Sequence, residues 1–332
     1  MRFISVIPWF AVSMLMLAVA GCGGGEEGGD YRGEQRIVTL SPSLTQMLVD
    51  SGASDLLVGV GEHDAAAPPG MPVVGHFVDV DTEKLLSLEP THVMTVRTRQ
   101  EPPRRLRNLA AAGRFELLVY PYPYTIDAAL EVLHNRSRAE SARTDGDTED
   151  SGAGGVYSPP SVGEVLGMPE RAAALEMRVR RQLEAVGEVT AGRERLSVLM
   201  LIGTRSLMAS GPGSVLDELL DYAGGRNAAA GASVSAPTYD REALTALAPE
   251  VIVLLLPHAP PLTENDPRLA ELRGLPVPAV ENGRIHLIND PLAVLPSTNM
   301  PAAAAALAKA IHPSLAGELD ERLERIARES AQ

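Results

Sequence analysis

The chain is poor in cysteine, in tryptophan and in aromatic residues generally. Its 332 residues include one cysteine, Cys22, and one tryptophan, Trp9, both close to the amino terminus. A single cysteine excludes an internal disulfide. Aromatic residues make up 4% of the sequence, so a ligand site in the body of the chain has to rely on Tyr, Phe and aliphatic side chains.

Acidic residues outnumber basic residues in this chain. The chain has 29 Lys and Arg against 43 Asp and Glu, which gives a net charge of −14 at pH 7. Such an acidic balance argues against a nucleic-acid partner and against a hold on anionic lipid through Lys and Arg. We therefore expect no nucleic acid among the partners.

Long apolar runs are absent except at the amino terminus. Residues 6–20 are almost wholly apolar, Arg2 precedes them, and small residues lead into Cys22. This pattern is typical of a lipoprotein signal peptide, here residues 1–21, with Cys22 as the lipidated first residue of the mature chain. An uncleaved membrane helix is the alternative, but the run falls short of the ~20 residues that a span needs. We expect an extracytoplasmic protein that a lipid anchors to the membrane, in the periplasm or at the outer face of the cytoplasmic membrane.

The body of the chain contains a repeat. Residues 81–90 and 240–249 share the pattern D-x-E-x-L-x-x-L-x-P, and each copy leads into a β-branched run. Each copy predicts a short helix that feeds a buried strand. Two copies so far apart indicate two similar lobes, each with its own α/β core. Small ligands bind in clefts of the kind that two lobes form.

Predicted strands alternate with predicted helices in both halves of the chain, and this alternation favours largely parallel sheets. Ser43 and Gln46 have the spacing of a capping box, so we expect Ser43 to cap the first helix. Leu175, Val179 and Leu183 recur at helical spacing and predict a long helix between the lobes. The predicted strands are 37–40, 57–60, 92–96, 117–120, 197–202, 251–256 and 284–288.

Composition divides the chain into segments. Residues 135–163 are rich in Ser, Gly, Asp, Glu, Thr and Pro and predict an acidic disordered insert, although an interaction loop is an alternative. The glycine-rich stretch behind Cys22 predicts a flexible tether. The predicted organisation is a signal peptide (1–21), a tether (22–35), an N-terminal α/β lobe (36–134), the insert (135–163), an inter-lobe helix (164–190), a C-terminal α/β lobe (196–312) and a C-terminal helix and tail (313–332).

Ordered segments of the chain resemble a known family, the substrate-binding proteins of ABC importers for iron–siderophores, haem and cobalamin. The resemblance implies an α/β fold of two Rossmann-like lobes with mainly parallel sheets, a single long backbone helix that joins them, limited hinge motion and a ligand cleft between the lobes. The segments that carry it are 36–46, Gly75 with 81–93, 209–227, 239–253 and 283–285.

The chain also departs from the family pattern. Gln46 stands where a Glu is usual, and Pro296-Ser-Thr-Asn299 replaces a late Pro-Arg element. The insert is extra. The low aromatic content weakens a cobalamin or haem assignment, because flat macrocycles are commonly held by aromatic faces.

The resemblance implies a binding protein rather than an enzyme, with no intrinsic cofactor. The expected ligand is a metal chelate, iron–siderophore ahead of cobalamin and haem, and the protein, expected to be a monomer, would deliver it to a permease that an ATPase subunit drives. In this family a Glu on each lobe docks onto arginines of the permease, and the matching positions are Glu83 and Glu242. A carboxylate in the first turn of a helix also suits the helix dipole, and the two roles are compatible.

Residues that line the cleft should come from loops at the carboxyl ends of strands. The arginines could pair with carboxylates of an anionic chelate or with a haem propionate. The histidines could ligate a metal or haem iron, and the tyrosines could stack on a ligand or ligate haem iron. Solvated loops and ordinary packing are the alternatives for each. The candidates are His63, His76, Arg97, Tyr122, Tyr124, Arg205, Tyr239 and His258.

Three other functions remain open. A binding protein for bare zinc or manganese would need converging His and carboxylate ligands, but the histidines are scattered. An enzyme could use Ser43 or Ser214 as a nucleophile, yet G-x-S-x-G, H-E-x-x-H and P-loop motifs are all absent, and helix caps or turns explain both serines better. A lipoprotein that keeps the fold could also serve as a scaffold or sensor.

Overall fold

The computed structural model describes residues 35–76, 78–97, 101–135, 159–204, 206–263 and 266–330. Residues 31–332 form one compact unit, separate from residues 1–30. The predicted signal peptide, Cys22, the tether up to residue 34 and residues 136–158 of the predicted insert lie outside the described residues. No helix in the described part of the chain is long and apolar enough to cross a membrane.

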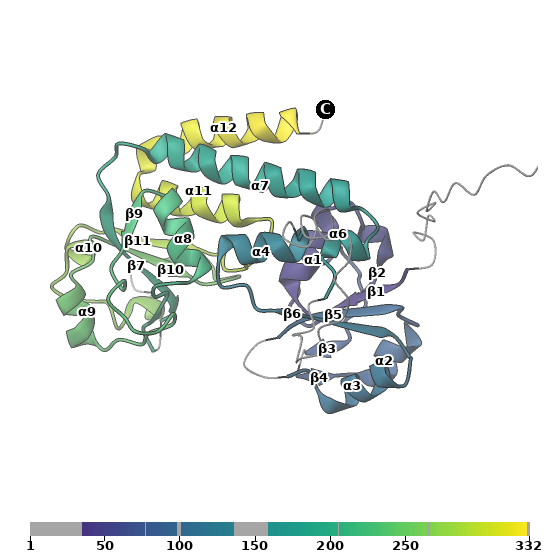
Figure 1. Ribbon diagram of the computed structural model, residues 1–332. Helices are drawn as coiled ribbons and strands as arrows, with labels where there is room; N and C mark the ends of the chain where they lie inside the picture. The colour runs from purple at the N-terminus through teal and green to yellow at the C-terminus, as the bar shows by residue number, and fades with distance from the viewer. Residues whose placement is uncertain are drawn as a thin grey trace, which may run out of the picture. The chain divides into compact units, whose positions relative to one another are not determined.

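The first lobe is built on a four-stranded sheet in the order β2-β1-β5-β6 (Figure 1). All three strand pairs are parallel, as the alternation of strands and helices predicts. A two-residue antiparallel pair, β3 with β4, lies off this sheet. The bounds are β1 Ile37–Thr39, α1 Pro42–Asp50, a 3-10 turn Ser54–Leu56, β2 Leu57–Val60, β3 Gly75–His76, β4 Asp79–Val80, α2 Thr82–Ser87, β5 His92–Arg97, α3 Arg104–Ala111, β6 Glu116–Pro121 and α4 Ile126–Leu133.

The second lobe has a five-stranded sheet in the order β11-β10-β7-β8, and β9 also pairs with β7. Only the short strand β8 runs antiparallel to its neighbour. The bounds are β7 Leu196–Gly203, β8 Met208–Ala209, α8 Val215–Tyr222, β9 Gly225–Asn227, α9 Arg241–Leu247, β10 Val251–Leu255, a 3-10 turn Pro267–Leu269, α10 Pro278–Glu281, β11 Ile285–Ile288, α11 Met300–Ile311, a 3-10 turn Pro313–Leu315 and α12 Ala316–Glu329.

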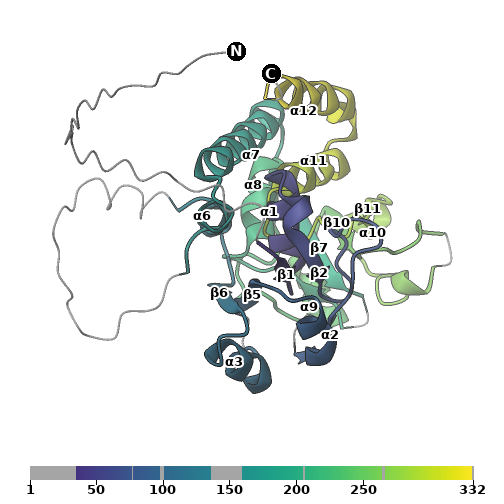
Figure 2. The same ribbon diagram turned by 90° about the vertical axis from the view of Figure 1, so that its right-hand side faces the viewer.

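A long helix, α7 (Pro169–Thr190), connects the two lobes in sequence. The prediction placed its start at residue 164, but a separate short helix, α6 (Val162–Val165), occupies that position. The chain breaks between them because Gly167 has a positive φ of 62° and Pro169 then starts the new helix. Helices α11 and α12 flank α7 (Figures 1 and 2).

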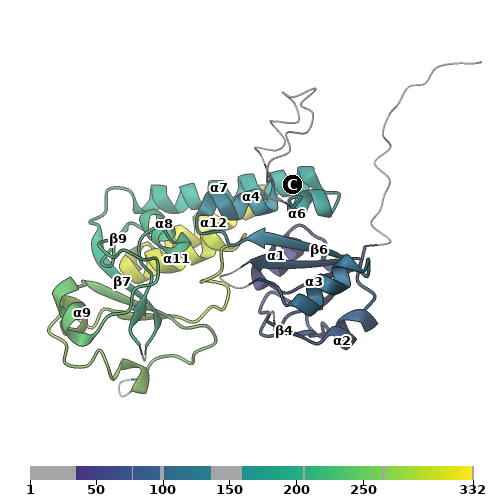
Figure 3. The same cartoon turned by 60° about the horizontal axis from the view of Figure 1, so that its bottom comes forward.

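Both sheets are covered by helices on both faces, and strand alternation divides the faces between different apolar clusters. In the first lobe Ile37 and Met94 belong to the cluster that contains α1 and α7, whereas Val38 and Val93 belong to a second cluster that contains α2 and α3. Figure 3 shows α2 and α3 on the same side of the first sheet. The second lobe repeats this arrangement, with α9 and α10 over one face of its sheet.

The largest apolar cluster runs through both lobes. It joins Leu118 of the first sheet to Val198 and Val253 of the second, with Val179 and Leu183 of α7 in the same cluster. All described apolar clusters lie between residues 37 and 323, so the unit of residues 31–332 holds its own core. A shared core resists independent movement of the lobes, because hinge motion would have to open close-packed contacts.

The repeated segments have the predicted structure in both lobes. Asp81 caps α2 by accepting hydrogen bonds from the backbone N–H groups of Glu83 and Lys84, and Asp240 caps α9 by accepting from Ala243 N. Each helix ends before a proline, and the preceding residue, Glu89 or Ala248, is left-handed in both copies. The repeat thus extends from sequence to capping and backbone conformation.

The first helix starts differently from the prediction. Ser41, not Ser43, is the N-cap of α1, and its side chain makes no capping hydrogen bond. Pro42 occupies the first helical position, where its fixed φ favours the helix and its missing N–H costs nothing. Ser43 lies buried inside the first turn, so the capping prediction was wrong.

Candidate functional site

A cavity of about 500 Å³ lies between the loop that follows β6 and the second lobe. This volume is within the range of small-molecule sites. Its walls come from the carboxyl ends of β6, β7 and β10, the edge at which α/β sheets bind ligands. It is lined by Tyr122, Pro123, Tyr124, Ile202, Ser210, Ser214, Val215, Leu216, Ser235, Ala236, Leu255, Pro257, Val294 and Pro296.

The first lobe contributes a pair of tyrosines to this cavity. The ring centroids of Tyr122 and Tyr124 are 4.9 Å apart and the ring planes are tilted by 59°. Tyr122 is 39% exposed and Tyr124 51% exposed, so both rings can still bury area against a ligand. Burial raises the pKa of the Tyr122 phenol, and Tyr124 raises it further. Tyr122 is therefore neutral at physiological pH and able to donate a hydrogen bond.

The second lobe contributes three serines, which the sequence analysis did not include among the ligand candidates. The Oγ atoms of Ser210 and Ser214 are 2.8 Å apart. Ser214 Oγ also donates to Gly211 O and accepts from Asp217 N, so it caps α8. A hydroxyl committed to a cap and a turn is a poor nucleophile, in keeping with the expectation that Ser214 is structural.

The loop that holds these serines needs a glycine. A Cβ on Gly211 would lie 2.4 Å from the backbone oxygen of Val234 and 2.8 Å from Pro237. This close approach brings Ser235 and Ala236 to the cavity wall. Ser235 comes from an irregular stretch with no helical or strand periodicity, so the sequence carries no signal for its place in the site.

One hydrogen bond between the lobes lies next to the tyrosine pair. Glu218 of α8 accepts from the backbone N–H of Ile126, the first residue of α4, at 2.7 Å. Thr125 caps the same helix end by accepting from Ala128 N. A carboxylate from the second lobe thus fixes the start of α4, two residues after Tyr124, and favourably meets the positive end of its dipole.

The lining carries no charged residue in the described part of the chain. Of the eight predicted cleft residues, only Tyr122 and Tyr124 line the cavity. Tyr239 lines a different hollow, and Arg205 lies outside the described residues. The structure therefore brings together an uncharged set of aromatic, aliphatic and hydroxyl groups.

The other predicted residues lie on exposed loops and strand ends. Arg97 forms an ion pair with Glu101 at 3.7 Å. His63 and His258 have positive φ values of 58° and 59°, which mark tight turns, and His76 accepts a long hydrogen bond from Val78 N. Within the described ranges, no three His, Cys, Asp or Glu side chains gather in a group that could hold a metal ion.

Comparison with known proteins agrees with this arrangement. A family model described as periplasmic binding protein matches residues 160–292. The vitamin B12-binding protein of Photorhabdus laumondii is 24% identical over 226 residues, which cover 68% of this chain and 72% of that protein. Over residues 160–292 the chain is thus similar to periplasmic binding proteins.

Solved structures show the same fold. A periplasmic haem-binding protein from Pseudomonas aeruginosa matches with a TM-score of 0.63 at 26% identity, over 84% of this chain and 93% of that one. The periplasmic vitamin B12-binding protein of Vibrio cholerae matches with a TM-score of 0.60 at 20% identity, over 83% and 96%. Both similarities confirm two α/β lobes with mainly parallel sheets. Substrate-binding proteins of this family bind and release ligands rather than transform them.

The two glutamates of the repeat occupy equivalent positions in the two lobes. Glu83 and Glu242 are exposed in the first turns of α2 and α9, two residues after the capping Asp. Glu242 borders a hollow of about 460 Å³ that is also lined by Asp240, Arg241, Glu271 and Tyr239. Three carboxylates against one guanidinium give this hollow a net acidic rim.

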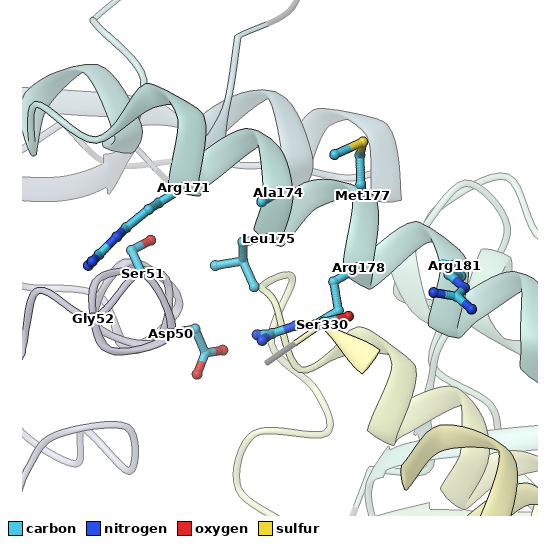
Figure 4. Close-up of a pocket in the computed structure, with 10 residues that line it drawn as sticks. All are labelled: Asp50, Ser51, Gly52, Arg171, Ala174, Leu175, Met177, Arg178, Arg181 and Ser330. Atoms are coloured by element: carbon cyan, nitrogen blue, oxygen red, sulfur yellow. The ribbon is translucent and has the colours of Figure 1, made fainter. Parts of the chain in front are cut away.

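A second large hollow, of about 530 Å³, lies at the carboxyl end of α1 (Figure 4). Arg171 extends from α7 toward Ser51, and Arg178 lies near Asp50 and the end of α12 at Ser330. Carboxyl ends of helices are negative, so these arginines complement two helix dipoles. The helices explain this hollow without a ligand.

Proposed function

We propose that this protein captures a tetrapyrrole-type metal chelate, with a corrinoid as the favoured ligand, and delivers it to the permease of an ABC importer. The uncharged cavity lined by tyrosines, serines and aliphatic residues supports this proposal most strongly. A corrinoid presents a flat apolar ring system and a periphery of neutral amides. Aromatic faces suit the ring, and serine hydroxyls suit the amides.

The low aromatic content of the chain does not oppose this ligand. Two of the seven tyrosines stand together at the cavity, so the site has aromatic surface although the rest of the protein has little. The relative in Photorhabdus laumondii, described as a vitamin B12-binding protein, adds to the proposal. An iron–siderophore, the first choice of the sequence analysis, stays an untested prediction.

Haem is the second candidate. A neutral phenol on Tyr122 or Tyr124 could become an axial ligand of haem iron, and a haem-binding protein is among the structural neighbours. Haem propionates, however, are best held by cationic groups, and the described lining offers none. This difference in charge places the corrinoid ahead of haem.

Delivery would use the two glutamates of the repeat. The acidic rim around Glu242, with Asp240 and Glu271, suits a cationic side chain of a permease. Glu83 would provide the equivalent contact on the first lobe. The expected lipid anchor at Cys22 would keep the protein at the extracytoplasmic membrane surface, and an ATPase subunit would drive transport.

The cavity is expected to change little when it binds. The core is continuous across both lobes through α7, and Ser297 Oγ donates to Ser43 O across the lobes at 2.7 Å. A preformed site pays a smaller ordering cost on binding. Affinity then depends mainly on how well the ligand fits the tyrosine pair and the serines.

Calorimetry on residues 31–332 tests this function. Cyanocobalamin, haem, a ferric siderophore and Zn²⁺ would be titrated in turn, and absorption spectra would report any new iron ligand. We expect 1:1 binding of cyanocobalamin, and Tyr122→Ala and Tyr124→Ala should each weaken it by about ten-fold through lost ring contact. Tyr239→Ala, outside the cavity, is the matched control.

Other results would overturn parts of the proposal. Haem binding with a phenolate absorption band that Tyr122→Phe or Tyr124→Phe removes would make haem the ligand. Binding of Zn²⁺ and of none of the chelates would show that the ligand is not a metal chelate. A Tyr239→Ala defect equal to those of the cavity variants would move the site away from the cavity.

A further inference from the structure

The segment around α3 has a charge opposite to that of the chain as a whole. Residues 102–115 contain Arg104, Arg105, Arg107 and Arg114 and no acidic residue, in a protein whose net charge is −14. The apolar residues of the helix face inward, and Leu106 is fully buried in the cluster below α2 and α3. The arginines therefore cover the outer surface of the helix.

All four arginines are exposed. None of their side chains forms a hydrogen bond or an ion pair with another described residue. Several other arginines are paired, as Arg180 is with Asp127 and Arg195 with Asp221. Arg104 and Arg105 also start their helix, where positive charge opposes the dipole, so their placement gives no stability that would explain them.

The position of α3 indicates which surface it meets. Leu85 of α2 and Leu106 of α3 share one apolar cluster with Phe115, so the two helices cover the same face of the first sheet (Figures 1 and 3). The outer surface of α3 therefore lies on the same side of the first lobe as α2, the helix that carries the proposed docking residue Glu83. A surface that adjoins a membrane-protein contact also faces the lipid around that membrane protein.

We infer that the four arginines of the α3 segment contact the anionic headgroups of a phospholipid membrane beside the permease. The orientation of the protein toward the membrane rests on the proposed docking function. The contact between the arginines and the headgroups requires only lipid. Guanidinium groups match phosphate oxygens in fork geometry. None of the arginines borders a described hollow, so the surface suits a fluid layer of headgroups that can rearrange around it better than a single shaped partner.

This contact revises the expectation drawn from net charge. The total of −14 conceals a basic surface on one helix, while the acidic remainder of the protein is repelled by the same membrane. The two effects together would orient the protein with α3 toward the bilayer. Each arginine near an anionic membrane is expected to strengthen partition by about five-fold, and salt should screen the effect.

Vesicle flotation of residues 31–332 tests the inference. Vesicles of phosphatidylcholine would be compared with vesicles that also contain phosphatidylglycerol, at low and at high salt. We expect binding only to the anionic vesicles at low salt, and R104Q/R105Q/R107Q should weaken it by about a hundred-fold. The control R322Q/R325Q/R328Q removes the same charge from α12, where Arg322 pairs with Glu188 and Arg328 with Glu324, and it should bind like the parent.

Three results would overturn the inference. These are absence of parent binding to anionic vesicles, equal losses in the two triple variants, and equal binding to neutral vesicles. If the α3 variant binds vesicles normally but fails to associate with permease in nanodiscs, the arginines contact an acidic protein surface instead. Thermal unfolding of both variants shows that the fold is intact. Cyanocobalamin binding is a separate readout, so its failure would count against the proposed function and not against this contact.

Discussion

The two lobes share a scaffold but contribute differently to the site. Both have a parallel sheet, and in both an Asp-capped helix leads through a proline into a central strand. The first lobe nevertheless gives the cavity a single run, Tyr122–Tyr124, whereas the second lobe supplies the serines and most of the aliphatic wall. None of the cavity residues lies within the repeat. Duplication of a scaffold thus explains the fold, and ligand recognition depends on loops that the lobes do not share.

The largest expected effect concerns the cores of the repeat helices. Leu85 and Leu244 occupy equivalent positions and are both fully buried, but Leu85 belongs to a smaller cluster than Leu244. Leu85→Ala and Leu244→Ala should each lower the free energy of unfolding by about 3 kcal/mol. Because the main core joins the lobes, each variant should still unfold in one transition by circular dichroism.

Two separate transitions would contradict the shared core. Leu86→Ala and Leu247→Ala are less suitable controls because both side chains are half-buried, so Ser87→Ala, at an exposed position of α2, provides the baseline. Ser87→Ala should change stability by less than about 0.5 kcal/mol.

The second comparison is between the two glutamates that are proposed to dock onto a permease. If Glu83 and Glu242 act together, Glu83→Gln and Glu242→Gln should each lower transport, and the double variant should lower it by about ten-fold. Ligand affinity in calorimetry should stay unchanged, because neither residue lines the cavity. Glu271→Gln is the informative control, since it also borders the acidic hollow but lies outside the repeat.

If the double variant transports at the normal rate, neither glutamate docks onto the permease. Each would then only interact with the dipole of its own helix. A larger defect in Glu242→Gln than in Glu83→Gln would show that the lobes do not dock equally. The hollow beside Glu242 favours that asymmetry, because Asp240 and Glu271 add their charges to that of Glu242 there.

The sequence predicts the scaffold better than the site. Apolar runs and Pro or Asp boundaries locate every main strand, since burial on both faces of a parallel sheet leaves a continuous apolar signal. The break at Gly167 was missed because apolar periodicity continues across it. Ser210 and Ser235 were missed because the approach of Gly211 to Val234 places them, and such a contact depends on tertiary structure alone. Eight residues were predicted to line the cleft because they follow the carboxyl ends of strands. Of these, only Tyr122 and Tyr124 line the cavity, since the sequence does not show which strand ends converge.

The capping aspartates should show a smaller effect than the buried leucines. Asp81→Ala and Asp240→Ala each remove a helix cap and should lower the free energy of unfolding by about 1 kcal/mol. Asp81 accepts two backbone hydrogen bonds and Asp240 accepts one, so Asp81→Ala should cost at least as much as Asp240→Ala. Asp81→Asn and Asp240→Asn retain an acceptor and should recover most of the loss. Denaturant unfolding measures both pairs, and a larger cost at Asp240 would contradict this ordering.

The smallest expected effect is a difference in acid sensitivity between the lobes. Burial lowers the pKa of His92 in the first lobe, but the Glu116 carboxylate, 3.6 Å away, opposes this shift. In the second lobe burial lowers the pKa of His286 and of His312, and the positive charge of Arg284 lowers both further. A histidine whose folded pKa lies below its ordinary value of 6.5 contributes stability that is complete above that value. This stability is lost as the pH falls through the folded pKa.

Variants of opposite sign can separate the two lobes. Arg284→Gln should raise the pKa of His286 and His312 and flatten the loss of stability below about pH 6.5, whereas Glu116→Gln should lower the pKa of His92 further and steepen it. The free energy of unfolding, measured by denaturant between about pH 5 and pH 8, reports both changes. Burial raises the pKa of Asp64, but that carboxyl is common to all variants and cancels in their differences. Equal slopes in the two variants would show that neither charge acts on its histidine, and the half-exposed positions of these histidines keep the expected difference below that of a lost helix cap.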